Sequence, residues 1–319
     1  MISAKIIADS KNQFGNRLTT LEVVMPRIIL AEFNTHRMLS RNSASSRAIP
    51  FDKLVKSVEK NPFIPIKWMK NHTGMQGNQY FNDAEEPDGI AGFLKHQWLE
   101  ARDNAIIKAQ SLADQGLTKQ IVNRLLEPFM WHTVLVSATE WENFFALRYD
   151  SHAEIHMQEV AKVMLEAMNN SIPVELKPDE WHIPYGDKMI LDNENRHVSP
   201  YKNNVISWSE LKDILAVKIS TAMCAGLSYT VVGEDGKQLD NEKLIKRHDM
   251  LAENGHWSPF EHCAKAMTEE EYEHNAMLTT LKSDTWRREL GWCGNFRGFV
   301  QYRKMFKNEN RTDKRLIIK

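Results

Sequence analysis

The sequence has few cysteines and no long apolar run. Cys224, Cys263 and Cys293 show no metal-type spacing, and an odd count without a disulfide framework indicates a reducing compartment. No apolar stretch reaches membrane-spanning length, and the first residues lack the apolar region of a signal peptide. The net charge of −1 gives no global field that favours nucleic acid or anionic lipid. We therefore expect a cytoplasmic protein that binds neither nucleic acid nor membranes, and any phosphate site must come from a few placed arginines.

The pattern of apolar residues predicts a mixed α/β (α+β) protein. Runs rich in Ile, Val and Leu predict strands at 2–8, 18–30, 129–137 and near 260–267. Helical spacing predicts helices at 92–115, 117–127, 138–168 with a break near Asp150, 208–226, 240–253, around 268–290 and at 295–306. Residues 173–205 contain four prolines and are expected to be an irregular crossing segment. No domain boundary is evident in this pattern.

The densest group of chemically active side chains spans residues 36–47, named here the HR segment. It holds three arginines, one histidine, four serines and one asparagine in twelve residues. Arginine offers a rigid fork of donors suited to phosphate, and serine hydroxyls add further donors. The segment follows an apolar strand and precedes Pro50, which places it at a strand exit. A solvated polar loop or a basic localisation-type patch remains the alternative.

The HR segment, HRxxSxNxxSxR, resembles the signature of the flavin-dependent thymidylate synthases. Two longer segments also resemble that family: NFFALRYDSHA at 143–153 (the LRxDxH segment) and GHWSPFEH at 255–262 (the PFEH segment). Two shorter ones match as well: residues 224–229 (the SY segment) and 124–128 (the RxxxP segment), where Glu127 occupies a leucine position. Ordinary members have the SY and PFEH segments first. The order in this chain implies a circular permutation.

The resemblance implies one permuted catalytic domain over residues 1–319, with a mixed, mostly antiparallel sheet flanked by helices. Residues 1–172 would form the nucleotide and flavin half, 173–205 the joint between the old termini, and 206–319 the other half with a C-terminal extension. The implied reaction converts dUMP to dTMP with methylenetetrahydrofolate, NADPH and FAD. The family's sites are shared between subunits of a homotetramer, so we expect that assembly.

Candidate site residues follow from the residue types and from the resemblance. Arg47 and Arg124, with Ser45 and Ser46, are candidates for the nucleotide phosphate. The resemblance places Arg148 towards the base and Glu32 near the sugar and base, and makes Arg148 and Ser45 the candidate catalytic residues. It implies flavin or folate contacts at His36, Arg37, Asn143, His152, Ser228, His256, Ser258 and Glu261. No metal site is expected, because His152 and His156 lack a third ligand.

Several positions depart from the family pattern. Thr35 replaces the first arginine of an RHR triplet, Glu32 replaces a glutamine and Ala48 replaces a tyrosine. Ser137 and Thr139 stand where the family has asparagine and arginine that help hold the flavin. A carboxylate suits an amino donor, so a cytosine nucleotide, or hydroxymethyl rather than methyl transfer, stays open. A non-catalytic nucleic-acid binder is the second alternative. Residues 294–304 either replace the lost flavin contacts or form a basic amphipathic helix.

The permutation makes a geometric prediction. The strand at 18–30 should pair with the one near 260–267 in a shared sheet, at about 4.8 Å. Ser258 and Glu261 should then approach one flavin together with His36 or Arg37.

Overall fold

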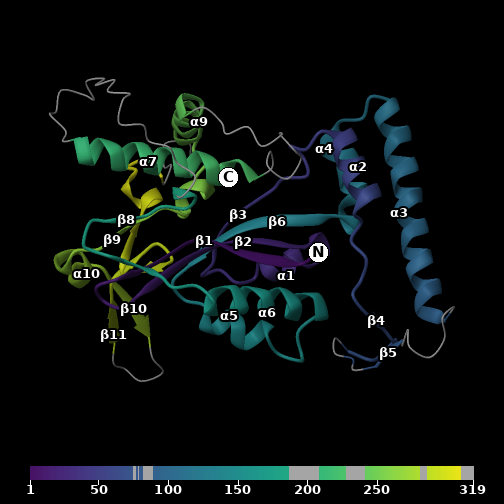
Figure 1. Cartoon of the computed structure of the whole chain (residues 1–319), viewed down its shortest axis with the longest axis horizontal. Helices are drawn as coiled ribbons and strands as arrows, with labels where there is room; N and C mark the ends of the chain where they lie inside the picture. Colours follow the sequence, from purple (N-terminus) through teal and green to yellow (C-terminus); the bar gives the residue numbers. More distant parts are fainter. Residues whose placement is uncertain are drawn as a thin grey trace, which may run out of the picture.

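A five-stranded sheet forms the centre of the computed structural model, which describes residues 1–74, 77, 79–81, 89–186, 208–227, 241–280 and 286–309 (Figure 1). The strand order is β3-β6-β2-β1-β7, and every pairing is antiparallel except that of β1 with β7. The strands are β1 (Ser3–Asn12), β2 (Arg17–Pro26), β3 (Ser40–Ser43), β6 (Trp131–Ala138) and β7 (Val174–Leu176). The fold is therefore a mixed, mostly antiparallel α+β structure flanked by helices, as the sequence and the resemblance predicted.

Helices α5 (Glu142–Arg148) and α6 (Ile155–Asn169) cover one face of this sheet. Alternate β2 residues, Leu21, Val23 and Met25, point to that face and pack in a core with α6. The break between the two helices lies near Asp150, as predicted. The break ends at Glu154, which caps α6 because its side chain accepts hydrogen bonds from backbone N–H groups of the first turn.

The opposite face is covered by a second, three-stranded sheet and by helix α7 (Trp208–Ala225), which packs against α9 (Asn241–Asn254). The second sheet has the order β14-β9-β8, from β8 (Trp181–His182), β9 (Ala264–Ala266) and β14 (Phe299–Gln301). Leu18 of β2 packs on the second sheet, and Leu135 of β6 packs against Cys224 of α7. Residues from both ends of the chain thus share one interior.

A row of buried polar side chains lies in the contact between the two sheets, beside the apolar cluster that contains Leu18 and Phe299. Ser40, Ser137 and Thr20 lie opposite one another on β3, β6 and β2, so their hydroxyls form a row on one face. The Thr20 and Ser137 hydroxyl oxygens are 2.6 Å apart. We call these three residues, together with His182, His262 and Gln301, the buried polar layer. All six have relative exposures of 1% or less.

The far side of the polar layer supplies a partner for each hydroxyl. His182 Nε2 lies 2.8 Å from Thr20 Oγ1, and His262 Nδ1 lies 2.9 Å from Ser137 Oγ. Gln301 Nε2 donates to Ser40 Oγ at 3.1 Å. Buried polar groups are costly unless they are hydrogen-bonded, so these pairs fix how the second sheet sits on the first.

A separate helical cluster lies beyond the end of the sheet at which β6 begins (Figure 1). Its apolar core includes Leu54, Val58, Ala109 and Leu126. It contains α2 (Phe51–Lys60), α3 (Ile90–Asp114), α4 (Lys119–Val122) and the 3-10 helix η2 (Asn123–Phe129). The predicted helices at 92–115 and 117–127 are therefore confirmed, the second as an α turn followed by a 3-10 segment.

The remaining described elements are short. They are η1 (Arg27–Ile29), α1 (Leu30–Phe33), β4 (Trp68–Met69), β5 (Tyr80–Phe81), η4 (Ser258–Glu261), α10 (Glu269–His274), β10 (Ala276–Thr280), β11 (Trp286–Leu290), β12 (Trp292–Cys293), β13 (Phe296–Arg297) and η5 (Tyr302–Met305). The predicted strand at 18–30 ends at Pro26, because a 3-10 helix begins at the next residue. Most of the predicted irregular segment, from 187 onward, lies outside the described residues.

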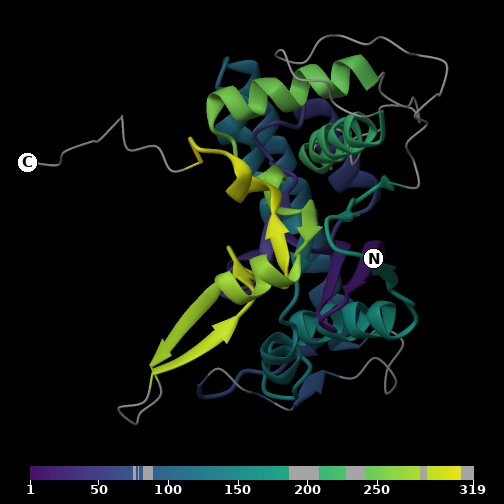
Figure 2. The ribbon, with the colours of Figure 1, turned by 90° about the vertical axis from the view of Figure 1, so that its left-hand side faces the viewer.

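The helices predicted at 268–290 and 295–306 are largely wrong. Only α10 and the short η5 are helical, and β10 pairs with β11 in a ribbon that projects from the body (Figure 2). Gly291, Gly294 and Gly298 all have positive φ, which breaks the backbone into tight turns that helical spacing does not reveal. The basic amphipathic helix considered for 294–304 is wrong for the same reason.

The predicted pairing of the strand at 18–30 with the one near 260–267 is also wrong. β9 pairs with β14 and β8, while β2 pairs with β1 and β6 in the other sheet. The two strands pack face to face instead, because Leu18 of β2 shares an apolar cluster with Ala264 and Ala266 of β9. Among the helices described, none combines the length and the apolar character that crossing a membrane requires.

Burial of the polar layer should make stability depend on pH. Burial lowers the pKa of both His182 and His262 to about 3, whereas both take up protons near 6.5 when unfolded. The free energy of unfolding should be greatest above pH 6.5 and fall as the pH is lowered from 6.5 towards 3. Urea unfolding measured at several pH values tests this.

His262→Asn separates this effect from general acid sensitivity, because an asparagine amide can replace the bonded Nδ1. The slope of the unfolding free energy against pH should fall in this variant by up to the contribution of one proton, about 1.4 kcal/mol per pH unit. His96→Asn, at an exposed position on α3, should keep the full slope. Equal slopes in both variants would contradict the role given to His262.

Candidate functional site

The HR segment is the centre of the candidate site. Its first residues form a turn after α1, and Ser40–Ser43 form β3 at the edge of the large sheet. Because only one side of β3 is paired with another strand, its polar side chains can reach other elements. Each of the four other segments that resemble the family forms a hydrogen bond with the HR segment.

The LRxDxH segment meets the HR segment through Arg148, in the last turn of α5. Arg148 Nε donates to His36 Nε2 at 2.7 Å, and its Nη2 donates to Thr35 Oγ1 at 3.2 Å. His36 also packs edge-on against Phe144, with ring centroids 4.9 Å apart. Arg41 Nη1 donates to the His36 carbonyl oxygen at 2.7 Å. The imidazole is thus held by Arg148 and the Phe144 ring, while Arg41 fixes the backbone of His36.

These contacts determine the protonation of the site. Burial, then Arg148, then Arg41 lower the pKa of His36. Since Nε2 accepts the Arg148 hydrogen bond, His36 is neutral and carries its proton on Nδ1. Burial and then Glu154 raise the pKa of Glu32, while Arg148 acts in the opposite direction. Both shifts favour the uncharged forms of these two side chains.

The RxxxP segment approaches the end of the HR segment. Asn123, directly before it, donates from Nδ2 to the Ser46 carbonyl oxygen at 2.6 Å. Arg124 and Arg47 are the chain neighbours of these two residues, and both are exposed. The structure therefore brings together the backbone segments that carry the two predicted phosphate-binding arginines.

Ser46 differs from its neighbour Ser45. The Ser46 hydroxyl is buried and donates to Glu127 Oε1 at 2.6 Å, and Arg27 pairs with the same carboxylate at 3.3 Å. Glu127 stands where the resemblance expects leucine, so this departure gives Ser46 a partner inside the protein. Ser45 is exposed beside Arg47.

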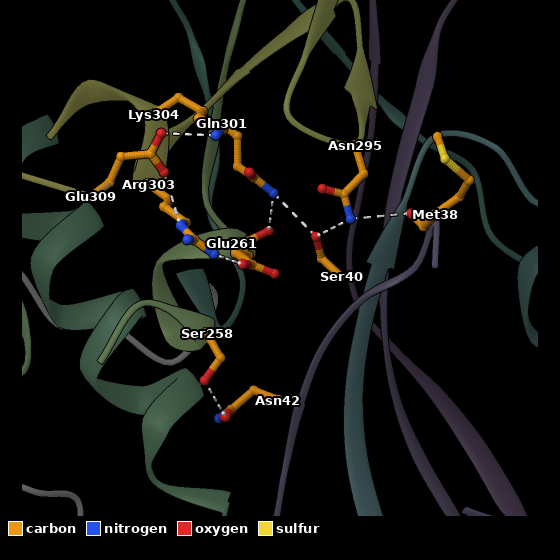
Figure 3. A network of polar contacts seen from close by, with 10 residues as sticks. All are labelled: Met38, Ser40, Asn42, Ser258, Glu261, Asn295, Gln301, Arg303, Lys304 and Glu309. Carbon is orange, nitrogen blue, oxygen red and sulfur yellow. Dashed lines mark hydrogen bonds and ion pairs between the residues drawn. The ribbon is translucent and has the colours of Figure 1, made fainter. Parts of the chain in front are cut away.

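Asn42 joins the SY and PFEH segments to the HR segment. Its Nδ2 donates to the Cys224 carbonyl oxygen at 2.7 Å. Its Oδ1 accepts from Ser258 Oγ at 3.1 Å, a contact visible at the foot of the network in Figure 3. One amide thus connects three segments separated by up to 216 residues.

The C-terminal residues 295–309 also reach this site, where the sequence left open whether residues 294–304 replace lost flavin contacts. Gln301 Nε2 bonds both Ser40 Oγ and the Glu261 carbonyl oxygen, and Arg303 pairs with the Glu261 carboxylate (Figure 3). Arg303 is held in turn by Glu309 at 3.0 Å. The Glu261 side chain, expected at the flavin, is therefore bound to the protein's own C-terminal segment.

The remaining predicted cofactor residues lie at the surface. His152 bonds Asp150 at 2.7 Å and its side chain is 69% exposed. Arg37, Asn143 and His256 are exposed, and Ser228 lies outside the described residues. Within the ranges that the structure describes, no group of three or more His, Cys, Asp or Glu could hold a metal ion. The arrangement offers arginine, asparagine, histidine and serine donors, which suit a phosphorylated ligand.

Residues 16–174 match the family model described as thymidylate synthase complementing protein. The match contains the HR, RxxxP and LRxDxH segments, in that order along the chain. No curated protein matches the chain. The SY and PFEH segments lie beyond the matched region and reach the HR segment through Asn42.

Arg148→Gln should raise the pKa of His36 towards its ordinary value, because one of the two nearby positive charges is removed. NMR titration of the histidine ring signals measures this shift directly. Arg102→Gln, on the distant helix α3, is the matched control and should leave the His36 titration unchanged. A His36 pKa that stays the same or falls in Arg148→Gln would show that Arg148 does not control this imidazole.

Proposed function

Because residues 16–174 belong to the thymidylate synthase complementing protein family, the flavin-dependent thymidylate synthases, we propose that the chain methylates dUMP to dTMP. The methylene group would come from methylenetetrahydrofolate and the electrons from NADPH through FAD. The observation that carries the proposal is the set of hydrogen bonds by which four other segments meet the HR segment. These residues lie far apart in sequence and share no local reason to converge.

Circular permutation is part of the proposal. The family match stops at residue 174, while the SY and PFEH segments follow it in the chain. The bonds from Asn42 to Cys224 and Ser258 bring these late segments to the same place as the early ones. We propose one permuted catalytic domain over residues 1–319, with the joint between the old termini in 173–205. Permutation is tolerated where old termini lie close together and the cut falls in an exposed connection.

The nucleotide would bind with its phosphate at Arg47 and Arg124, with Ser45 adding a hydroxyl donor. Two guanidinium groups can together neutralise a phosphate dianion, and their planar forks match its oxygens. Arg148 would orient the base, and Arg148 and Ser45 remain the proposed catalytic residues. Ser46 would act indirectly, since its hydroxyl is bound to Glu127.

Glu32 supports a second candidate substrate. Burial and the nearby Glu154 raise the pKa of this side chain, which favours its protonated form more than in water. The carboxylate accepts a hydrogen bond from the amino group of cytosine, and the protonated acid donates one to a uracil carbonyl. A dCMP methylase is therefore the alternative. Hydroxymethyl transfer is a further alternative, and it differs from methylation in needing no net reductant.

The donor set fits a flavin dinucleotide. Arg37, Asn143, His152, His256 and Ser258 are exposed groups that can donate to phosphate and carbonyl oxygens. When bound, FAD would carry electrons between NADPH and the one-carbon unit. His36, neutral and fixed by Arg148, would present an N–H group rather than a positive charge. Ser228 stays in the proposed set, and Glu261 would act by holding Arg303 at the edge of the site.

Assembly and location follow from the same reasoning. We propose a homotetramer in the cytoplasm, because family sites are shared between subunits and the cysteines form no disulfide framework. A nucleic-acid binder is disfavoured, since such proteins usually carry a basic surface and this chain has a net charge of −1.

A turnover assay should distinguish these functions. Purified protein is supplied with FAD, NADPH and methylenetetrahydrofolate, and dUMP and dCMP are offered separately. We expect dUMP to gain a methyl group, read by product mass. A methylated or hydroxymethylated cytosine product would select the second candidate. No product from either nucleotide, with no flavin bound, would reject the enzyme function.

Arg47→Ala should weaken dUMP binding by about 2–4 kcal/mol, the scale for losing one partner of a charge-assisted contact. FAD affinity should change much less, because this arginine is assigned to the nucleotide phosphate. The control is Lys108→Ala, which removes the positive charge of an exposed lysine on α3. Calorimetric titration with dUMP measures the difference, and unchanged affinity in Arg47→Ala would rule out the assignment.

A further inference from the structure

The two departures at the end of β6 both contact the late part of the chain. Ser137, where the family has asparagine, belongs to the buried polar layer and contacts His262. Thr139, where the family has arginine, accepts the backbone N–H of Arg297 through its Oγ1 at 3.0 Å. Neither side chain has the length or charge to replace the expected residue.

A short hairpin lies against these positions. β12 and β13 pair through Trp292 with Arg297 and Cys293 with Phe296, which leaves Gly294 and Asn295 as a two-residue turn. Gly294 has a φ of 65°, and a Cβ there would lie 2.5 Å from Gln301 Oε1, so glycine is required. Phe296 is fully buried in the core between the sheets. The hairpin is therefore held in place by its turn and by its own core residue.

The hairpin carries an asparagine and an arginine two residues apart, Asn295 and Arg297. The family has the same two residue types, also two residues apart, at the positions of Ser137 and Thr139. Asn295 Nδ2 donates to Ser40 Oγ at 3.0 Å, beside the HR segment (Figure 3). Arg297 is half-buried, and its Nε donates to the Leu290 carbonyl oxygen at 3.3 Å. That bond anchors the guanidinium at Nε, and neither Nη group bonds any of the described residues, so both can face an anion.

We propose that Arg297 binds a phosphate group of the flavin dinucleotide, with Asn295 positioning the hairpin against Ser40. The hairpin thereby replaces the asparagine and arginine that the end of β6 lacks. This proposal rests on the proposed function, because it assumes that the chain binds FAD. It gives the C-terminal run a cofactor-binding role that the family match, which ends at residue 174, does not include.

The test compares FAD with riboflavin, which has the same ring system and no phosphate. Arg297→Ala should weaken FAD binding roughly 10- to 100-fold, the scale of a hydrogen bond to a charged group, and leave riboflavin binding unchanged. Flavin fluorescence measures both affinities without turnover. Lys307→Ala removes an exposed cation from the same segment and should change neither affinity. The hairpin should stay folded in Arg297→Ala, because its bond to Thr139 uses the backbone N–H.

A second variant, Arg297→Lys, keeps a positive charge on the hairpin and leaves the bond to Thr139 in place. FAD affinity closer to wild type in Arg297→Lys than in Arg297→Ala supports a phosphate contact. Equal loss for FAD and riboflavin in Arg297→Ala would indicate a structural role and overturn the proposal. Full FAD affinity in Arg297→Ala would overturn it and leave the proposed function intact. A wild-type protein that binds no flavin would overturn both.

Discussion

The hydroxyl of Ser137 is the contact on which the arrangement of this molecule depends most. It lies 2.6 Å from Thr20 on one side and 2.9 Å from His262 on the other, in an interior without exposure to solvent. An apolar contact between two sheets tolerates sliding, because dispersion forces have little directional preference. A hydrogen bond between buried groups does not, since a shift of one residue would leave donors unpaired. The polar layer therefore fixes the register of the second sheet on the first.

That register places the PFEH segment beside the HR segment. His262 follows Glu261 directly, so fixing the imidazole also fixes the 3-10 helix that carries Ser258 and Glu261. Gln301 acts at the same point from β14, because its amide bonds both Ser40 and the Glu261 carbonyl. The chemistry proposed for the surface thus depends on a layer of side chains that has no direct part in it.

The elements that the sequence predicted well are those whose pattern is local. Helix 90–114, the break between α5 and α6, and strand β6 each follow from spacing or from a cap such as Glu154. The C-terminal third was predicted poorly, because its glycines with positive φ and its two-residue turn outweigh helical spacing. The pairing of β2 with β9 was also wrong. Sequence periodicity identifies buried strand faces and does not indicate whether two faces pair edge to edge or pack face to face.

The candidate site was predictable as a set of residue types and not as a set of contacts. The resemblance identified His36, Arg148 and Ser258, and the structure gives each a partner within or beside the HR segment. The sequence could not show that Glu127 accepts a hydrogen bond from the Ser46 hydroxyl or that Arg303 pairs with the Glu261 carboxylate. Those contacts join residues 42 to 81 positions apart. They arise from tertiary packing, which no local pattern encodes.

Asn42 bonds residues that are synthesised much later than itself, which determines when the site can form. Its two partners lie 182 and 216 residues later, and the partners of Ser40 from the hairpin and β14 lie 255 and 261 residues later. The first 169 residues contain β1, β2, β6 and α6, which can pack as a unit while the chain leaves the ribosome. In that unit the hydroxyl row stays open to water and the HR segment has only its early partners. The site is therefore completed only after nearly all of the chain has been translated, so an incomplete chain exposes a polar sheet face instead of a reactive centre.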